Sequence, residues 1–100
     1  MPTYDRTEQF IADHRRLSPD ERQAFREAVD KFIEDLENLP HGQFRGGLRV
    51  KPMQAAPGIF EMTWEGDNGR ATFQYGEELT EGDPHIVWRR VGGHDIFHTP

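Results

Sequence analysis

The hydrophobic pattern divides the chain into a first part with the periodicity of helices and a second part with the alternation of strands. Residues 1–5 precede both parts and contain a proline, so we expect a frayed start or at most a short edge strand there. From Phe10 to Leu17, apolar positions follow the three- and four-residue spacing of one helix face. Thr7 suits the N-cap, and the pattern predicts a first helix that runs to about Arg16.

A second helix has the clearest start signal in the chain. Ser18 is a favoured N-cap, Pro19 suits the first helical position, and Glu21 completes a capping box. The apolar stripe that follows is continuous and consists of Ala24, Phe25, Ala28, Val29, Phe32, Ile33, Leu36 and Leu39. It predicts a helix to about Asn38 that Pro40 ends. Together the two helices are expected to form an αα-hairpin with one apolar face.

After the helices the pattern alternates with a period of two, as in half-buried strands. Four strands are predicted, over residues 44–53, 59–64, 70–75 and from His85 onward. Their short connections, one of which ends in Asn68-Gly69, favour an antiparallel sheet, and the helices are the candidates to cover one face. The predicted fold is a single α+β domain, 1–100, with a helical hairpin (1–40) packed on one face of a three- to four-stranded antiparallel sheet (44–97).

The last strand can be placed in two ways, because both of its faces are partly apolar. Ile86, Trp88 and Arg90 alternate with Val87, Arg89 and Val91, and either set suits the core. The strand breaks at Gly92-Gly93 and leads into His94 and Phe97. A strand that ends in glycines can hold a histidine at a fixed place on the surface.

Composition narrows the class of protein. The 100 residues contain no cysteine, which excludes a disulfide framework and a thiolate nucleophile. Neither a secretory signal nor an apolar run of membrane-spanning length is present, so we expect a soluble, cytoplasmic protein. The net charge of −6 argues against non-specific electrostatic binding of nucleic acid. Basic residues nevertheless cluster locally, at Arg45, Arg49 and Lys51 and at the Arg89-Arg90 pair.

These clusters suggest a site on the open face of the sheet. Arg49 and Lys51 share a parity on their predicted strand, opposite the apolar residues, and Arg70 is placed on the same side of the sheet. His94 would lie at the rim. Cations around a histidine suit phosphodiester chemistry, since they stabilise charge on the phosphate while the imidazole moves protons. Phe97 could stack on a base.

Simpler interpretations accompany each of these residues. Strand arginines are more often solvated charges that pair with glutamate, and a histidine after two glycines is more often a turn residue. His94 and His98 lie four residues apart, a metal-ligand spacing on a helix. However, the glycine break argues against a helix there and no third ligand is suggested, so no metal is expected. The sequence suggests no partner for His85.

The order of these segments resembles a known family. Two helices followed by LRVKPM, GIFEMTW, NGRATFQY and HIVWRRVGGHDIF resemble the RelE/ParE superfamily of bacterial type II toxins, over about Thr7 to Phe97. The most specific piece is WRRVGGHDIF, which is similar to the final strand of YafQ-type and RelE-type toxins. At Phe60-Glu61-Met62 the chain is closer to HigB-like relatives than to members with arginine in this strand.

The resemblance implies a metal-independent endoribonuclease that cleaves mRNA, usually on the ribosome, by 2′-hydroxyl attack on the adjacent phosphate. It also implies an antitoxin partner. The roles carried over are proton transfer for His94, phosphate binding for Arg49, Lys51 and Arg70, and base stacking for Phe97. Further candidates for RNA binding are Arg45, Arg89 and Arg90. Two alternatives stay open: a ParE-like gyrase inhibitor that is not a nuclease, and an inactive protein-binding module of the same fold.

Overall fold

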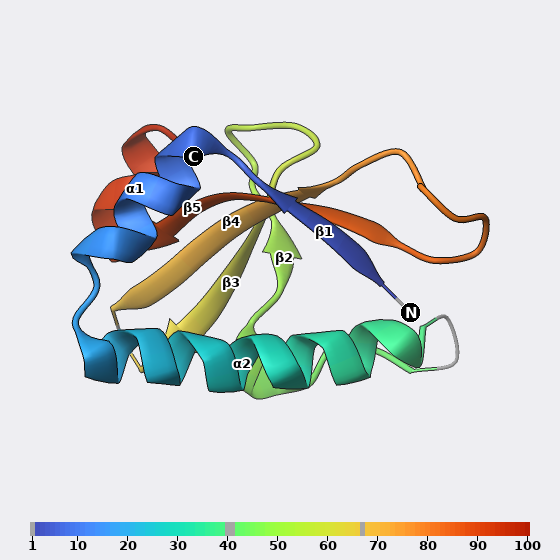
Figure 1. Ribbon diagram of the computed structural model, residues 1–100, viewed down its shortest axis with the longest axis horizontal. Coiled ribbons are helices and arrows are strands. Elements are labelled where there is room, and N and C mark those ends of the chain that lie inside the picture. Colours follow the sequence, from blue (N-terminus) through green and yellow to red (C-terminus); the bar gives the residue numbers. More distant parts are fainter. Residues whose placement is uncertain (1, 40–41, 67) are drawn as a thin grey trace.

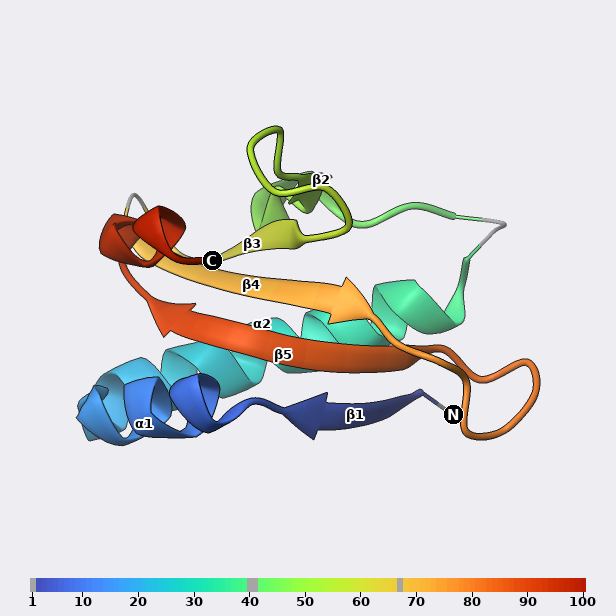
Figure 2. The same cartoon turned by 90° about the horizontal axis from the view of Figure 1, so that it is seen from above.

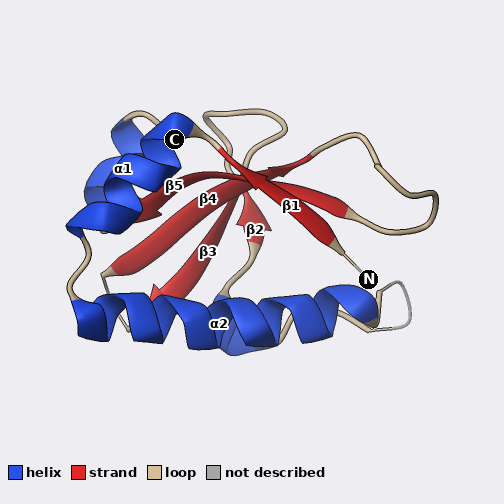
Figure 3. Cartoon of the chain, in the orientation of Figure 1, coloured by secondary structure: helices blue, strands red, loops and turns tan. Residues whose placement is uncertain are grey.

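The computed structural model describes residues 2–39, 42–66 and 68–100 and contains a five-stranded mixed sheet with two α-helices (Figure 1). Its elements are β1 (Thr3–Arg6), α1 (Glu8–Arg16), α2 (Pro19–Glu37), the 3-10 turn η1 (Gly46–Leu48), β2 (Lys51–Pro52), β3 (Phe60–Glu65), β4 (Gly69–Tyr75), β5 (His85–Gly92) and the 3-10 helix η2 (His94–His98). The strand order is β1-β5-β4-β3-β2. Figure 3 separates these helices, strands and loops by colour.

Both helices begin where the sequence predicts. The Thr7 side chain accepts a hydrogen bond from the Phe10 amide, 3.1 Å, at the start of α1. Ser18 and Glu21 form both hydrogen bonds of the capping box, at 2.8 and 3.1 Å. The second helix ends at Glu37, and the proline expected to end it, Pro40, lies outside the described residues. The capping signals were therefore sufficient to locate both helix starts.

The helices do not form the simple paired hairpin that the sequence suggested. They touch near their connection, where the Arg22 side chain donates to the carbonyls of His14 and Arg15 at 3.2 and 2.9 Å. Beyond this point α1 lies beside the end of β5, whereas α2 runs along one face of the sheet (Figures 1 and 2). The two helices therefore have different structural roles, because α2 covers the core and α1 closes an edge.

The sheet has five strands and is mixed, whereas a three- to four-stranded antiparallel sheet was expected. The additional strand is β1, which pairs in parallel with β5 so that Thr3 lies opposite His85 and Arg6 opposite Trp88. The prediction was wrong because it relied on hairpin-length connections, and a parallel pair between the two ends of a chain has none. Past Arg6, the β5 edge is closed by α1, with the Thr7 hydroxyl donating to the Arg89 carbonyl at 2.7 Å.

The predicted strand over residues 44–53 is also wrong. Residues 46–48 form η1 instead, Arg49 has a left-handed backbone with φ 47°, and the strand that pairs with β3 is reduced to Lys51 and Pro52. The apolar and polar residues around Leu48 alternate as they do in a strand. However, Gly46-Gly47 permits a turn, and Pro52 has no N–H with which to extend the strand pairing. Leu48 still reaches the core and is buried.

A β-bulge resolves the ambiguous last strand. Thr72 pairs with Arg90 and Phe73 with Trp88, which leaves Arg89 as an extra residue on β5. The bulge changes the phase of alternation, so that Ile86 and Trp88 before it and Val91 after it are all buried. Each of the two alternating sets is therefore buried over part of the strand: the set of Ile86 and Trp88 before the bulge, and the set of Val91 after it.

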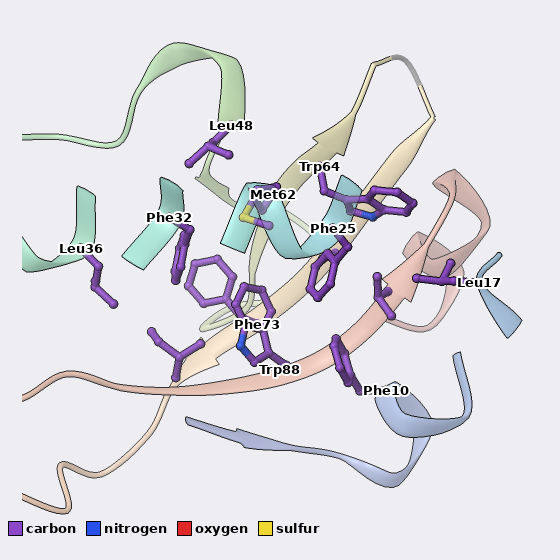
Figure 4. Packing of buried hydrophobic residues seen from close by; sticks show 14 residues of the cluster. Phe10, Leu17, Phe25, Phe32, Leu36, Leu48, Met62, Trp64, Phe73 and Trp88 are labelled. Atoms are coloured by element: carbon purple, nitrogen blue, oxygen red, sulfur yellow. The ribbon is translucent and has the colours of Figure 1, made fainter. Parts of the chain in front are cut away.

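Aromatic rings hold α2 against the sheet (Figure 4). Phe32 is fully buried, and its ring centroid lies 5.0 Å from Phe44, 5.0 Å from Phe73 and 5.3 Å from Trp88. Phe25 contacts Trp88 edge-on at 5.7 Å, nearer the start of α2. Such ring pairs stabilise a core beyond their burial alone. The core thus fixes which face of the sheet is covered and which stays open.

Candidate functional site on the open face of the sheet

The face of the sheet away from α2 carries a row of polar residues. Strand register places Lys51 opposite Glu61, Glu61 opposite Thr72, and Thr72 opposite Arg90. Because neighbouring strands lie about 4.8 Å apart, the Cα atoms at the two ends of this row are about 14 Å apart. The row is therefore long enough for a nucleic-acid strand to cross it.

Lys51 is the most accessible cation of the row. Its ammonium group lies 3.7 Å from the Glu61 carboxylate, and the side chains are 65% and 18% exposed. An exposed pair of this kind contributes little to stability. Lys51 can therefore exchange this partner for a phosphate, and Glu61 is left with a carboxylate on the open face.

Arg49 is exposed but does not lie in a strand. Its amide donates to the Gly46 carbonyl at 3.1 Å, and its left-handed backbone turns the chain from η1 into β2. The expected shared strand face of Arg49 and Lys51 is therefore not formed. Arg49 lies instead at the β2 edge of the sheet, two residues before Lys51.

Arg70 is buried rather than presented on the surface. Its guanidinium donates to the Gly69 carbonyl at 2.9 Å and the Gly66 carbonyl at 3.4 Å, and 7% of the residue is exposed. These bonds hold the β3–β4 hairpin from within. The structure does not bring Arg70 to the same exposed surface as Lys51.

The bulge residue Arg89 is bound to its neighbours on the open face. Its guanidinium donates to the Gln74 side-chain oxygen at 2.7 Å and to the Pro100 carbonyl at 3.3 and 3.2 Å. The last residues therefore lie against β5, and Pro100 binds the guanidinium of Arg89, which the sequence suggested for RNA binding. A ligand for Arg89 has to displace this contact.

Arg90 faces α1 instead. It donates to the Asp13 carboxylate at 2.7 and 3.2 Å, and also to the Thr99 carbonyl at 2.8 Å. The hydrogen bond to Asp13 raises the pKa of Arg90 above its ordinary value. Asp13 also accepts from the Val91 amide at 3.2 Å and is buried. Sequence reasoning missed Asp13; the available signal was an acid within the apolar stripe between Phe10 and Leu17.

His94 and Phe97 lie side by side in η2, with ring centroids 5.9 Å apart. Ile96 between them is buried, and a Cβ on Gly92 would meet it at 3.1 Å, so η2 rests on the end of the open face. His94 is exposed. The sequence argued against a helix after the two glycines; the 3-10 helix that forms there differs from an α-helix, since three residues complete each turn.

Arg45 lies on the helix side of the molecule. Its guanidinium donates to both oxygens of Asp35 at 2.8 and 2.9 Å, and its amide donates to the same carboxylate at 2.9 Å. The hydrogen bonds from Arg45 lower the pKa of Asp35 from 3.8 to about 2, and the same contact raises the pKa of Arg45. Arg45 therefore anchors residues 42–50 to α2, away from the open face.

The open face thus combines the exposed Lys51, Arg49 at its β2 edge, the Glu61 carboxylate and, at the other end, an imidazole beside an aromatic ring. These groups can bind a phosphate, accept a proton, donate a proton and stack on a base. Buried beneath them, the Thr72 hydroxyl has no hydrogen-bond partner among the described residues. The described ranges contain no cluster of three metal-ligating side chains, and none of their helices is long and apolar enough to cross a membrane.

The fold of this chain is similar to that of several solved toxin structures. The isolated Escherichia coli RelE toxin matches 93% of this chain and 84% of its own, at 15% identity and a TM-score of 0.57. The toxin–antitoxin complex RelBE from E. coli matches with 92% and 95% coverage, 16% identity and a TM-score of 0.57. The YoeB/ParE toxin from Agrobacterium tumefaciens follows with 92% and 98% coverage, 12% identity and a TM-score of 0.55.

No family model matches the chain, and no curated protein matches it. The chain nevertheless shares its fold with these three structures over nearly its whole length.

Proposed function

We propose that this protein is the toxin of a bacterial type II toxin–antitoxin system and cleaves mRNA as a metal-independent, ribosome-dependent endoribonuclease. The observation that carries the proposal is the fold match to RelE over 93% of the chain. The groups on the open face supply the chemistry such a reaction needs. The partner is an antitoxin, by analogy with the RelBE complex.

In the proposed reaction, the RNA backbone crosses the open face from β2 toward η2. Lys51 and Arg49 bind phosphate, and Phe97 stacks on a base. Glu61 accepts the proton of the 2′-hydroxyl, whose oxygen attacks the adjacent phosphorus. His94 donates a proton to the 5′-oxygen that leaves. The products are a 2′,3′-cyclic phosphate and a 5′-hydroxyl end.

Arg70 has a different role in this proposal from the one that the resemblance implied. Its guanidinium bonds to the carbonyls of Gly66 and Gly69 rather than to solvent. It is therefore a positioning residue that keeps β3 and β4 in register. The Arg89 guanidinium becomes available to RNA only when the contact with Pro100 opens.

Expression of the chain in growing bacteria without its partner tests the proposal. We expect growth arrest and cut transcripts, both relieved by His94→Ala and by Arg49→Ala. Lys31→Ala is the matched control, because Lys31 is an exposed cation on α2, on the opposite side of the sheet. Unchanged toxicity in both site variants contradicts the assignment of the site.

A protein-binding toxin without nuclease activity is the second candidate, either a ParE-like gyrase inhibitor or an inactive module. The specific observation in its favour is the neutralisation of cations on this face: Lys51 is paired with Glu61, and Arg70 is buried. This candidate predicts arrest without cut RNA and, for a gyrase inhibitor, induction of the DNA-damage response. Transcript mapping and a damage reporter in the same culture separate the two candidates.

A further inference from the structure

One polar group in the middle of the open face is buried without a partner. Thr72 of β4 is fully buried, and its hydroxyl has no hydrogen-bond partner among the described residues. The buried side chains of Asp13 and His85, by contrast, each make hydrogen bonds. An unsatisfied hydroxyl in the interior is costly, and a valine of the same shape would avoid the cost. Such a group in a native fold therefore needs an explanation.

Thr72 lies between two charged residues. The strand register places Glu61 of β3 on one side of it and Arg90 of β5 on the other. Side chains directly opposite one another in antiparallel strands have their Cβ atoms about 5 Å apart. A carboxylate, a hydroxyl and a guanidinium are thus neighbours across three strands. A phosphodiester reaction uses this combination, with donors for the phosphate oxygens and a base for the attacking hydroxyl.

The segment that ends in Thr99 and Pro100 covers this place. The preceding helix η2 contacts both β4 and β5, and Figures 1 and 2 show the segment on the side of the sheet away from α2. The Thr99 carbonyl accepts from Arg90 at 2.8 Å, and the Pro100 carbonyl accepts from Arg89 at 3.2 and 3.3 Å. Two consecutive carbonyl oxygens therefore bind two consecutive guanidinium groups, which are preferred partners of phosphate oxygens.

We propose that the Thr72 hydroxyl binds a backbone phosphate of RNA, and that Thr99 and Pro100 cover this place until RNA displaces them. The hydroxyl donates to a phosphate oxygen, and Arg90 binds the phosphate in place of the Thr99 carbonyl. Glu61 then lies on the other side of Thr72, where it can accept the proton of the 2′-hydroxyl. The inference rests on the proposed function, because that function is what makes RNA the ligand.

Two substitutions at Thr72 separate binding from packing. Thr72→Val keeps the shape and removes the hydroxyl, so the variant should be at least as resistant to urea, yet cleave ribosome-bound mRNA about tenfold more slowly. Thr72→Ser keeps the hydroxyl and removes a buried methyl group, so it should unfold at lower urea but retain cleavage. A purely structural role predicts the opposite order of activities. Thr80→Val, in the exposed loop before β5, is the control and should change neither property.

Binding is measured separately, with an RNA oligonucleotide that is 2′-O-methylated throughout and therefore cannot be cleaved. Thr72→Val should bind it about tenfold more weakly than the unaltered chain, and Thr72→Ser with similar affinity. The Thr99 amide donates to the Ile96 carbonyl at 3.1 Å. Its hydrogen exchange should become faster when the oligonucleotide binds, because the covering segment is displaced.

If the unaltered chain cleaves mRNA, an equal rate for Thr72→Val overturns the inference, and so does an equal loss of activity in Thr72→Val and Thr72→Ser. Unchanged exchange at Thr99 in the presence of bound oligonucleotide overturns the covering role. If the unaltered chain leaves mRNA intact, the nuclease proposal fails. Binding that depends on the Thr72 hydroxyl then still supports the phosphate site, whereas absence of binding overturns it as well.

Discussion

At the scale of single residues, Asp13 shows how a polar side chain can organise a fold that hydrophobic patterning describes only in part. Its carboxylate accepts from the Arg90 guanidinium and from the Val91 amide, and it is nearly inaccessible to water. Through these bonds α1 satisfies the part of the β5 edge that β1 does not reach. An unpaired strand edge is otherwise open to association with another chain.

Asp13→Ala is therefore expected to destabilise the protein strongly. It leaves the half-buried Arg90 guanidinium and the Val91 amide without their partner, and breaking a buried pair costs roughly 3–5 kcal/mol. Denaturant unfolding measures this loss. Arg16→Ala is the comparison, because Arg16 is 77% exposed and lies 3.6 Å from the same carboxylate. A loss below about 1 kcal/mol for Asp13→Ala contradicts this role.

At the scale of elements, Thr7 links the start of α1 to the sheet. Its hydroxyl oxygen accepts from the Phe10 amide as an N-cap and donates to the Arg89 carbonyl of β5. The Ser18 hydroxyl, by contrast, serves the capping box of its own helix. The two caps look equivalent in sequence but differ in structure.

Replacing each cap by alanine should reveal this difference. Ser18→Ala is expected to cost about 1 kcal/mol of unfolding free energy, the usual value for an N-cap. Thr7→Ala should cost about 1 kcal/mol more, since it also removes a side-chain hydrogen bond to the sheet. Equal losses in urea unfolding would show that the bond to Arg89 contributes nothing.

The segment between α2 and β2 is held by Asp35. Its pKa is lowered to about 2 in the folded protein from an ordinary 3.8, so the stabilisation is fully present above about pH 5 and disappears as the pH falls toward 2. Asp35→Asn should therefore be less stable than the natural chain at pH 7, and most of this difference should be lost near pH 2. Glu34→Gln is the comparison, because Glu34 makes one 3.3 Å contact and is 71% exposed. A difference that does not depend on pH rules out this explanation.

Elements with local signals were predictable, and elements that depend on distant pairing were not. The capping residues Thr7 and Ser18 located the helices, and alternation located β3, β4 and β5. The parallel β1 and the bulge at Arg89 depend on contacts between remote parts of the chain and have no local signature. In the site, the His94 and Phe97 rings lie side by side. Arg70 was predicted to be a surface cation, because the alternation of side chains along a strand indicates which face a residue lies on. It does not indicate whether the residue is buried on that face.

At the scale of the whole molecule, the sheet separates two surfaces with different chemistry. One face carries Lys51, Glu61 and, at its end, His94, and the opposite face is covered by α2 through the aromatic core. In our proposal RNA binds the first surface, so substitutions there can alter catalysis without disturbing the packing of α2.

We propose that the open face cleaves RNA by attack of the 2′-hydroxyl on the adjacent phosphate. The most direct test of this claim is to incubate the purified protein with translating ribosomes and to map the chemistry of the new RNA ends. We predict fragments with 2′,3′-cyclic phosphate and 5′-hydroxyl ends, formed on the order of 100-fold more slowly by His94→Ala and by Glu61→Gln. Intact mRNA, 5′-phosphate ends, or cleavage that both variants leave unchanged would contradict the claim.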